Sequence, residues 1–217
     1  MKKVTFLIDQ MHSHGGIEKL VSIKANYWAD VFGYEVTIIS TEQLDKPLLY
    51  PLSSKVSFKD LQINYDRRKS YFSWKNIMKL IKNLFKIQQY LNQEKPDFLI
   101  VASHIPITYI LPFLWYKGKI VKEFHFSKYN VNNDRFKQKV MNFVEAKYDK
   151  LIVLSEEERT FYPSKNTIVI PNPIPENAFE VNSIPMAEKE NIAVFVGRLA
   201  PVKQLEKLIA IWEKFVR

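Results

Sequence analysis

Short runs of apolar residues alternate along this chain with longer segments in which apolar residues recur every three or four positions. A continuous apolar run is typical of a buried strand, and the longer spacing is typical of a helix that buries one face. Strands are expected at residues 3–8, 35–40, 56–60, 98–102, 120–124, 150–154, 167–170 and 192–196. Helices are expected at residues 16–32, 74–93, 106–116, 133–147, 156–162 and 202–217. This alternation predicts an α/β fold with a doubly wound, mostly parallel sheet covered on both faces.

The segment from Pro171 to Pro185 breaks this pattern. It holds four of the eleven prolines and shows no helical period. Such a composition is typical of a connection between domains. We therefore expect one complete domain over residues 1–183 and, over residues 184–217, only the first strand and helix of a truncated second domain.

The composition excludes some chemistry and suggests a partner. The chain has no cysteine, so it has no disulfide, no thiolate metal site and no cysteine nucleophile. Its net charge is +9, and residues 55–95 alone carry ten Lys or Arg against three acidic residues. A local field of this kind favours an anionic partner such as a phosphate or an acidic membrane surface. Nucleic acid is not predicted, because the sequence contains no recognisable nucleic-acid-binding module.

No apolar run is long enough to span a bilayer. The longest candidate, Ile105 to Tyr116, contains two prolines. The apolar run at the N-terminus meets Asp9 after only a few residues, so we interpret it as a first strand and not as a signal peptide.

The helix expected at 74–93 has two contrasting faces. One carries the apolar residues Ile77, Leu80, Ile81, Leu84 and Leu91. The other carries a stripe of four lysines with no acidic residue among them: Lys75, Lys79, Lys82 and Lys86. Like charges at this spacing weaken a helix slightly, so helix stability does not explain the stripe. With the basic and aromatic residues just before it, the stripe suits a membrane interface. The plain alternative is a solvated outer face.

Gly15 and Gly16 stand between the first strand and the first helix. Glycines let a ligand approach the backbone, and the N–H groups at a helix start attract phosphate. Two glycines can also be a plain flexible turn. They do not form the three-glycine dinucleotide motif or a Walker loop.

A second strand–glycine–helix unit carries fixed cations. Gly197 and Arg198 follow the strand expected at 192–196, and Lys203 lies five residues further on, where the next helix begins. Arginine offers a planar fork to phosphate oxygens and lysine a point charge. Together they could hold a diphosphate and stabilise it as a leaving group. Two solvated surface cations are the alternative.

The four histidines differ in their setting. His104 and His125 each follow a strand, and ligands of parallel sheets bind at the carboxyl ends of strands. A capping role is the alternative for both. His12 and His14 lie in one loop with no third ligand nearby, so no metal site is predicted.

These pieces, in this order, resemble the N-terminal part of a family 4 glycosyltransferase with the two-domain Rossmann-like GT-B fold. The resemblance rests on Gly15-Gly16-Ile17-Glu18, Lys95-Pro96-Asp97, His125 in Glu-Phe-His-Phe, Ser155 in Val-Leu-Ser-Glu, Ile170-Pro171-Asn172-Pro173, and Val196-Gly197-Arg198-Leu199 with Lys203.

The resemblance implies transfer of a sugar from a nucleotide-sugar to an acceptor with retention at the anomeric carbon. The nucleotide-sugar would be a co-substrate, and neither a cofactor nor a metal would be needed. Arg198 and Lys203 would grip the donor diphosphate, Gly16 would bring backbone N–H groups close to the same phosphates, and His125 would contact the donor sugar. The first domain would hold the acceptor.

The chain departs from the family pattern at two places. Gln204 follows Lys203 where the family usually has glycine, and the downstream acidic pair that holds the donor's sugar and ribose in the family is absent, because the chain ends first. We therefore expect the isolated chain to be inactive.

The resemblance also implies a place in the cell and a pathway. The enzyme would work in the cytoplasm, with possible peripheral attachment to the inner face of the membrane, in the synthesis of a surface polysaccharide or a glycolipid. A nucleotide-sugar epimerase of the same fold and a non-catalytic phosphate-binding module are the alternatives.

Overall fold

The computed structural model describes residues 1–125, 135–162, 164–174, 192, 194–197, 199 and 203–215. The chain forms two compact units, Met1–Pro173 and Ile174–Arg217. The boundary expected between residues 183 and 184 lies outside the described residues.

The first unit is built on one seven-stranded sheet in which every strand pair is parallel. Its strands are β1 (Lys3–Ile8), β2 (Glu35–Ser40), β3 (Val56–Asp60), β4 (Phe98–Val101), β5 (Lys119–Glu123), β6 (Lys150–Val153) and β7 (Thr167–Val169). Their order across the sheet is β3-β2-β1-β4-β5-β6-β7. In register, Val4 of β1 pairs with Val36 on one side and Phe98 on the other. The predicted doubly wound α/β fold is confirmed.

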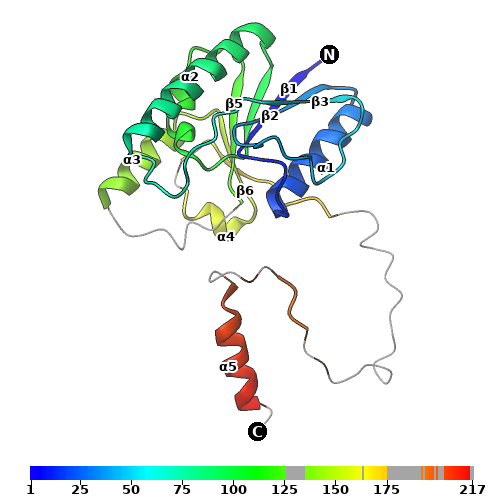
Figure 1. The fold of residues 1–217 in the computed structure, drawn as a ribbon, viewed down its shortest axis with the longest axis vertical. Helices are drawn as coiled ribbons and strands as arrows, with labels where there is room; N and C mark the ends of the chain where they lie inside the picture. Colours follow the sequence, from blue (N-terminus) through cyan, green and yellow to red (C-terminus); the bar gives the residue numbers. More distant parts are fainter. Residues whose placement is uncertain are drawn as a thin grey trace. The chain divides into compact units, whose positions relative to one another are not determined.

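Helices cover both faces of this sheet (Figure 1). One face packs against α1 (Gly16–Asp30). The other packs against α2 (Trp74–Glu94), α3 (Arg135–Glu145) and two short 3-10 helices, η1 (Pro106–Tyr109) and η2 (Leu111–Phe113). The one-turn helix α4 (Glu156–Arg159) follows β6 and buries none of its residues. The strand order explains this division, because right-handed crossovers toward β2 and toward β5 run on opposite faces.

Alternation along the strands produces the two cores. In β1, Val4, Phe6 and Ile8 point to the α1 side, and Leu7 points to the α2 side. Successive side chains of a strand point to opposite faces, so a strand that is apolar throughout fills both cores. Phe6 stacks on Trp28 of α1 with ring centroids 5.2 Å apart.

The segment 106–116 is not the α-helix that its apolar spacing predicts. It forms η1 and η2 instead. Pro106 starts the first of these short helices, and Pro112 lies inside the second. A proline lacks the N–H that an α-helix needs and its ring collides with the preceding turn, so a continuous helix cannot pass through Pro112.

The second unit contains α5 (Leu205–Phe215). The strand expected at 192–196 is absent from the described part of that segment, where Ile192 and residues 194–196 are in no strand. Val194 and Val196 are exposed. A strand needs a partner for its backbone groups, and the described residues of this unit contain no other strand to pair with it.

Within the described residues, no helix combines the length and the apolar character needed to cross a membrane.

Candidate functional site

The carboxyl ends of β1, β2, β4 and β5 meet at one edge of the sheet and bring polar residues together. Asp9 follows β1, Glu42 follows β2, Ser103 and His104 follow β4, and His125 follows β5. The chain turns toward β2 and β3 after β1, and toward β5, β6 and β7 after β4. The crevice between β1 and β4 is therefore the switch point at which doubly wound sheets bind ligands.

Asp9 is the centre of a charged network at this crevice. One carboxylate oxygen accepts a hydrogen bond from the Ser103 hydroxyl. The other lies 3.1 Å from an Arg67 guanidinium nitrogen. Arg67 also donates through Nε to Glu42 over 2.7 Å. One arginine thus joins two acidic side chains that follow different strands.

Glu42 is almost completely buried in this network. Burial raises the pKa of Glu42 above its ordinary value, and the hydrogen bond from Arg67 opposes this shift. Arg67 reaches the crevice from the loop after β3, so the network closes only when residues distant in the sequence come together.

Lys122 lies beneath the crevice. Its side chain is buried, and its ammonium group donates to the backbone carbonyl of Ser103. Burial lowers the pKa of Lys122 to about 7, although the carboxylates of Asp9, Glu123 and Glu145 act in the opposite direction. A lysine with this pKa is partly neutral near physiological pH, which is typical of functional sites.

His125 and Glu123 form a second buried pair. The His125 Nε2 atom lies 3.2 Å from Oε2 of Glu123, and Lys24 of α1 donates to the other carboxylate oxygen over 2.8 Å. Burial alone would raise the pKa of Glu123, but its contacts with His125 and Lys24 outweigh burial and lower it. Among the described residues, neither ring nitrogen of His125 makes a well-oriented hydrogen bond, so its contact with Glu123 is one of charge and proximity.

His104 faces His125 edge-on, with ring centroids 6.4 Å apart. His104 is exposed as a residue, but desolvation of its imidazole by the surrounding protein lowers its pKa. The positive charge of Lys122 lowers this pKa further. The structure therefore brings together the two histidines that the sequence singles out, at the expected edge of the sheet.

The glycine turn before α1 is tightly packed at one glycine and open at the other. A Cβ atom added to Gly15 would lie 1.8 Å from a carboxylate oxygen of Glu18, whereas one added to Gly16 would meet nothing within 4 Å. Glu18 places a negative charge at the helix start, where an anion is favoured. A phosphate could bind there only after this side chain moved aside. Gly16 is thus the glycine that offers space to a ligand.

A small cavity of about 70 Å³ lies between the start of α1 and the residues that follow β1 and β4. It is lined by Ile8, Asp9, Gln10, Ile17, Glu18, Arg67, Ala102 and His104. The cavity joins the start of α1 to the charged network around Asp9.

The predicted phosphate-binding cations belong to the second unit. Arg198 lies outside the described residues. Lys203 is exposed and lies two residues before α5 begins. Their role in holding a donor stays a prediction.

The four lysines of α2 do not form one outward stripe. Lys75 and Lys82 are exposed, whereas Lys79 and Lys86 are half-buried and donate to the backbone carbonyls of Asn64 and Leu61. Ile81, expected on the core-facing side, is exposed. The helix is thus rotated relative to the expected orientation, because Asn76 and Asn83 are buried in place of apolar residues.

Several residues of this edge are not recognisable as site residues in the sequence. Arg67 stands in a basic run that indicates only surface charge, and Lys122 stands in an apolar strand. Ser103 and Glu42 carry no motif. The only signal available for them is their position after, or at the end of, an expected strand.

No group of three or more histidine, aspartate or glutamate side chains in the described part of the chain could hold a metal ion. His12 and His14 therefore gain no third ligand there.

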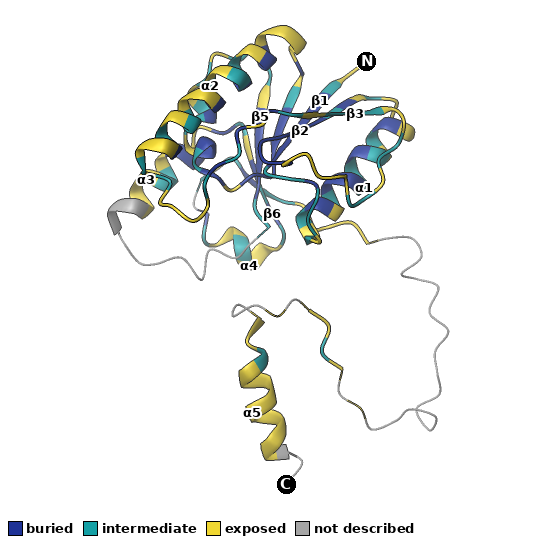
Figure 2. Ribbon diagram, in the orientation of Figure 1, coloured by how far each residue is buried: buried dark blue, intermediate teal, exposed yellow. Residues whose placement is uncertain are grey.

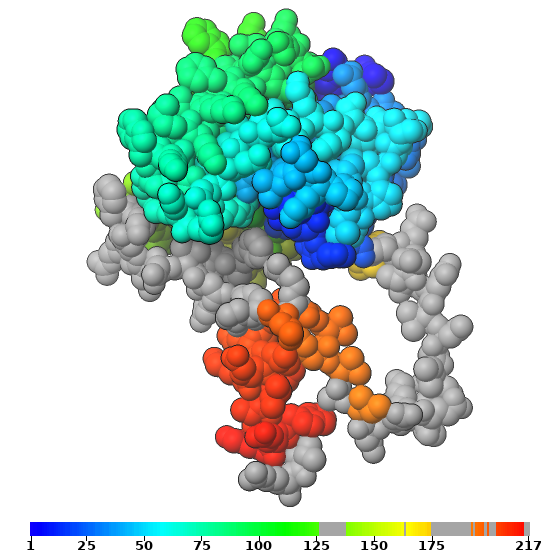
Figure 3. Space-filling model, in the orientation of Figure 1, coloured from blue at the N-terminus to red at the C-terminus, as the bar shows by residue number. Residues whose placement is uncertain are grey.

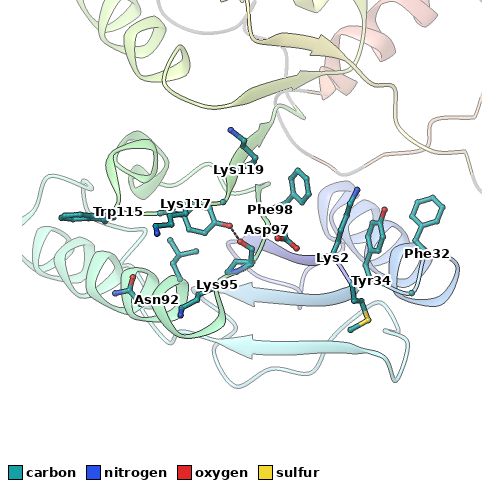
Figure 4. Close-up of a pocket in the computed structure, with 16 residues that line it drawn as sticks. Lys2, Phe32, Tyr34, Asn92, Lys95, Asp97, Phe98, Trp115, Lys117 and Lys119 are labelled. Atoms are coloured by element: carbon teal, nitrogen blue, oxygen red, sulfur yellow. Dashed lines mark hydrogen bonds between the residues drawn. The ribbon is translucent and has the colours of Figure 1, made fainter.

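A large hollow of the first unit lies at the opposite edge of the sheet (Figure 4). This groove of about 1220 Å³ is lined by the strand starts and neighbouring loops, with Lys2, Lys95, Lys117 and Lys119 beside the rings of Phe32, Tyr34, Phe98, Trp115 and Tyr116. The Tyr116 hydroxyl donates to the carbonyl of Pro96 over 2.5 Å, and the backbone N–H of Lys3 donates to Asp97. These two hydrogen bonds join the start of β1 and the loop before β5 to the residues before β4, which favours a structural role for Tyr116 and Asp97.

Comparison with known proteins supports the Rossmann-like GT-B fold. No family model matches the chain. A curated relative, the amylovoran biosynthesis glycosyltransferase AmsD from Erwinia amylovora, is 25% identical over 224 residues, which cover 98% of this chain and 58% of the relative. The chain thus spans little more than half the length of the relative that it matches.

Solved structures match most of the chain at low sequence identity. The sucrose-phosphate synthase from Thermosynechococcus elongatus matches with a TM-score of 0.58 and 16% identity, covering 79% of this chain and 48% of the synthase. The lipopolysaccharide outer core galactosyltransferase WaaB matches with 0.54 and 16%, covering 80% and 46%. The UDP-N-acetylglucosamine 2-epimerase from Rickettsia bellii matches with 0.53 and 13%, covering 79% and 45%.

These likenesses establish the fold and leave two enzyme classes open. The structural matches include both glycosyltransferases and an epimerase, and the curated relative is a glycosyltransferase. The chain is therefore similar to glycosyltransferases, and its first unit has the Rossmann-like fold of the N-terminal part of a GT-B enzyme.

Proposed function

We propose that this chain is the acceptor-side part of a glycosyltransferase that uses a nucleotide-sugar. The observation that carries the proposal is the polar cluster at the carboxyl ends of β1, β4 and β5. Asp9, Ser103, Lys122 and His125 converge there at the switch point of a GT-B-type sheet. The glycosyltransferase AmsD matches nearly the whole chain, which favours sugar transfer over other reactions of this fold.

In this proposal the residues have separate tasks. His125, held beside Glu123, contacts the donor sugar after the surrounding chain moves aside, because its side chain is only 4% exposed and its ring nitrogens have no hydrogen-bond partner among the described residues. The open backbone at Gly16 admits the donor phosphates. Arg198 and Lys203 of the second unit neutralise the diphosphate as it leaves, which is the step where fixed positive charge stabilises the transition state most. Retention at the anomeric carbon and independence from metal belong to the same proposal.

The acceptor is proposed to be a lipid-linked or polysaccharide chain at the inner face of the membrane. The support is the printed function of two similar proteins, amylovoran biosynthesis and lipopolysaccharide outer core synthesis. The basic segment 55–95 fits an acceptor that lies at an anionic surface.

The test compares the 217-residue chain with the full-length protein that carries it. Both are incubated with UDP-, GDP- and ADP-sugars, and both released nucleotide and sugar products are measured. We expect turnover only by the full-length protein. Arg198→Ala and Lys203→Ala should each lower kcat about 100-fold or more, as loss of one fixed donor does in comparable sites. Near-normal rates in both variants would remove these cations from the mechanism.

Epimerisation of a nucleotide-sugar is the alternative function, because an epimerase matches the fold nearly as well as WaaB does. The same incubations distinguish the two activities. A transferase releases a nucleoside diphosphate and attaches the sugar to an acceptor, whereas an epimerase converts one sugar into its epimer. Formation of an epimer with no sugar bound to an acceptor would establish the alternative.

A further inference from the structure

The outward side of α2 carries a row of large apolar side chains. Trp74, Met78, Ile81 and Phe85 are all exposed, and Phe72 stands just before the helix. We call these five residues the α2 apolar stripe. Trp74 is 75% exposed, Phe85 73% and Phe72 88%. Figure 2 shows exposed residues along the outward side of α2 and buried ones along its inner side.

The spacing places the helical part of the stripe on one line. Its four helical residues stand at offsets of 0, 4, 7 and 11, which lie above one another on a helix. The inner side of the helix buries Ile87 and Leu91 instead. Soluble proteins seldom leave such a contiguous apolar row uncovered, and a larger patch usually marks an interaction surface. The space-filling view shows the segment that contains α2, in teal and green, as an outer surface of the first unit (Figure 3).

Positive charge runs along the same side of the helix. Lys75 and Lys82 are exposed beside the stripe, and Arg68 and Lys69 precede it. Residues 67–93 contain seven Lys or Arg and no acidic residue. The surface that fits this helix must therefore accept aromatic and aliphatic side chains and carry negative charge.

We propose that the α2 apolar stripe docks on an anionic lipid bilayer, with the helix lying in the plane of the interface. Helices that bind in this way place Trp and Phe at the level of the headgroups and Lys beside anionic lipids. The aliphatic stems of Lys75 and Lys82 can lie along the apolar surface while their ammonium groups reach the phosphates.

A second copy of the chain fits the surface less well. A symmetric contact would place this helix against its own counterpart. The lysine rows of the two copies would then face one another with no acidic residue between 67 and 93 to compensate them. Charge complementarity thus favours lipid.

Docking would also place the charged crevice beside the membrane. Asn76, in the first turn of α2, accepts a hydrogen bond from the backbone of Asp66 and donates another to its carbonyl, each over 3.0 Å. The next residue, Arg67, contacts Asp9 and Glu42. The start of the stripe and the crevice are thus joined by a short, hydrogen-bonded loop. Docking would therefore bring the crevice close to a lipid-linked acceptor. This consequence rests on the proposed function, whereas docking itself does not.

Vesicle co-sedimentation tests the proposal on the 217-residue chain. Phosphatidylcholine vesicles with rising fractions of phosphatidylglycerol are used at low and high salt. The wild-type chain should bind in proportion to the anionic fraction. Phe72→Ser/Trp74→Ser/Phe85→Ser should weaken binding at least about tenfold at either salt concentration. Lys75→Gln/Lys82→Gln should weaken it about 30-fold at low salt and much less at high salt.

Matched controls separate the stripe from general effects. Lys46→Gln/Lys117→Gln removes the same charge from exposed positions elsewhere and should change binding little. Thermal unfolding should be similar for all variants, because the changed side chains are exposed. A second measurement uses brominated lipids. These should quench the wild-type fluorescence more than that of Trp74→Phe, which keeps an apolar ring.

Three results would overturn the proposal. They are absence of wild-type binding to anionic vesicles, equal binding by the triple variant, and a wild-type dimer that the triple variant converts to a monomer. Vesicle binding requires no sugar transfer. Its failure would leave the proposed function standing, and inactive full-length protein with normal vesicle binding would contradict only the proposed function.

Discussion

The two edges of one sheet carry different kinds of surface. At the carboxyl edge, Asp9, Glu42 and Lys122 are connected through Arg67 and Ser103. Asp9 and Arg67 also line a cavity of about 70 Å³. At the amino edge, the groove of about 1220 Å³ is much larger and has several aromatic rings and four lysines. The larger hollow is the less promising site. Strand direction brings loops from both sides of the switch point to the carboxyl edge, whereas the size of a hollow says nothing about its chemistry.

The ion pairs at the two edges should differ in their contribution to stability. Arg67→Met would leave Glu42, whose side chain is 5% exposed, buried without its partner. We expect a loss of about 1–3 kcal/mol in the free energy of unfolding, measured by urea denaturation. The Arg67 side chain itself is 48% exposed, so the lower part of this range applies at high salt.

The matched change at the amino edge is Lys119→Met. Lys119 pairs with Asp149 over 2.9 Å in a more exposed setting. Its loss should cost no more than about 0.5 kcal/mol. Equal losses in the two variants would remove the energetic distinction between the edges.

Lys122 should make stability depend on pH. Its pKa is about 7 in the folded protein and near its ordinary value of 10.5 in the unfolded chain. Between these values the unfolded chain binds more protons, so stability rises with pH. The cost of burying the charged amine is fully present below pH 7 and disappears as the pH approaches 10.5.

Urea denaturation of wild type and Lys122→Met across this pH range measures the effect. The wild type should gain stability relative to the variant by up to about 1.4 kcal/mol per pH unit above pH 7. A difference between the two proteins that stays constant from pH 6.5 to about 9 would show that Lys122 keeps an ordinary pKa.

Lys95, at the amino edge, should give a small effect of the opposite sign, a gain in stability. It ends α2 with a φ of 47°, in the left-handed region that favours glycine. Lys95→Gly should raise the free energy of unfolding by about 0.5–1 kcal/mol in thermal or urea unfolding, without altering sugar transfer by the full-length protein. A loss of transfer in this variant would indicate that the amino edge takes part in function.

The sequence predicts the sheet well because the relevant signal is local. Apolar strands such as Phe98–Val101 and the glycine turn before α1 are determined by neighbouring residues. Two segments that the sequence predicts wrongly have other causes: a proline within the segment and the lack of a partner strand. Pro112 divides a segment whose apolar spacing resembles a helix, and the segment 192–196 contains strand-forming residues but has no described partner strand.

The site is predicted in part for the same reason. His104 and His125 follow strands, so their common edge can be inferred from the chain. Arg67 comes to Asp9 from 58 residues away, and no local pattern indicates this pairing. The orientation of α2 is likewise not evident, because the burial of Asn76 and Asn83 turns Lys79 inward and the aromatic residues outward.

The most direct test compares His125→Ala with Lys117→Ala in the full-length protein. His125 belongs to the carboxyl edge and Lys117 to the amino-edge groove. Transfer from each nucleotide-sugar is measured, with thermal unfolding to confirm that both variants fold. We expect His125→Ala to lower kcat/KM for the preferred donor about 100-fold or more, and Lys117→Ala to stay within about twofold of wild type. Normal transfer by a folded His125→Ala variant, or a comparable loss in Lys117→Ala, would contradict this expectation.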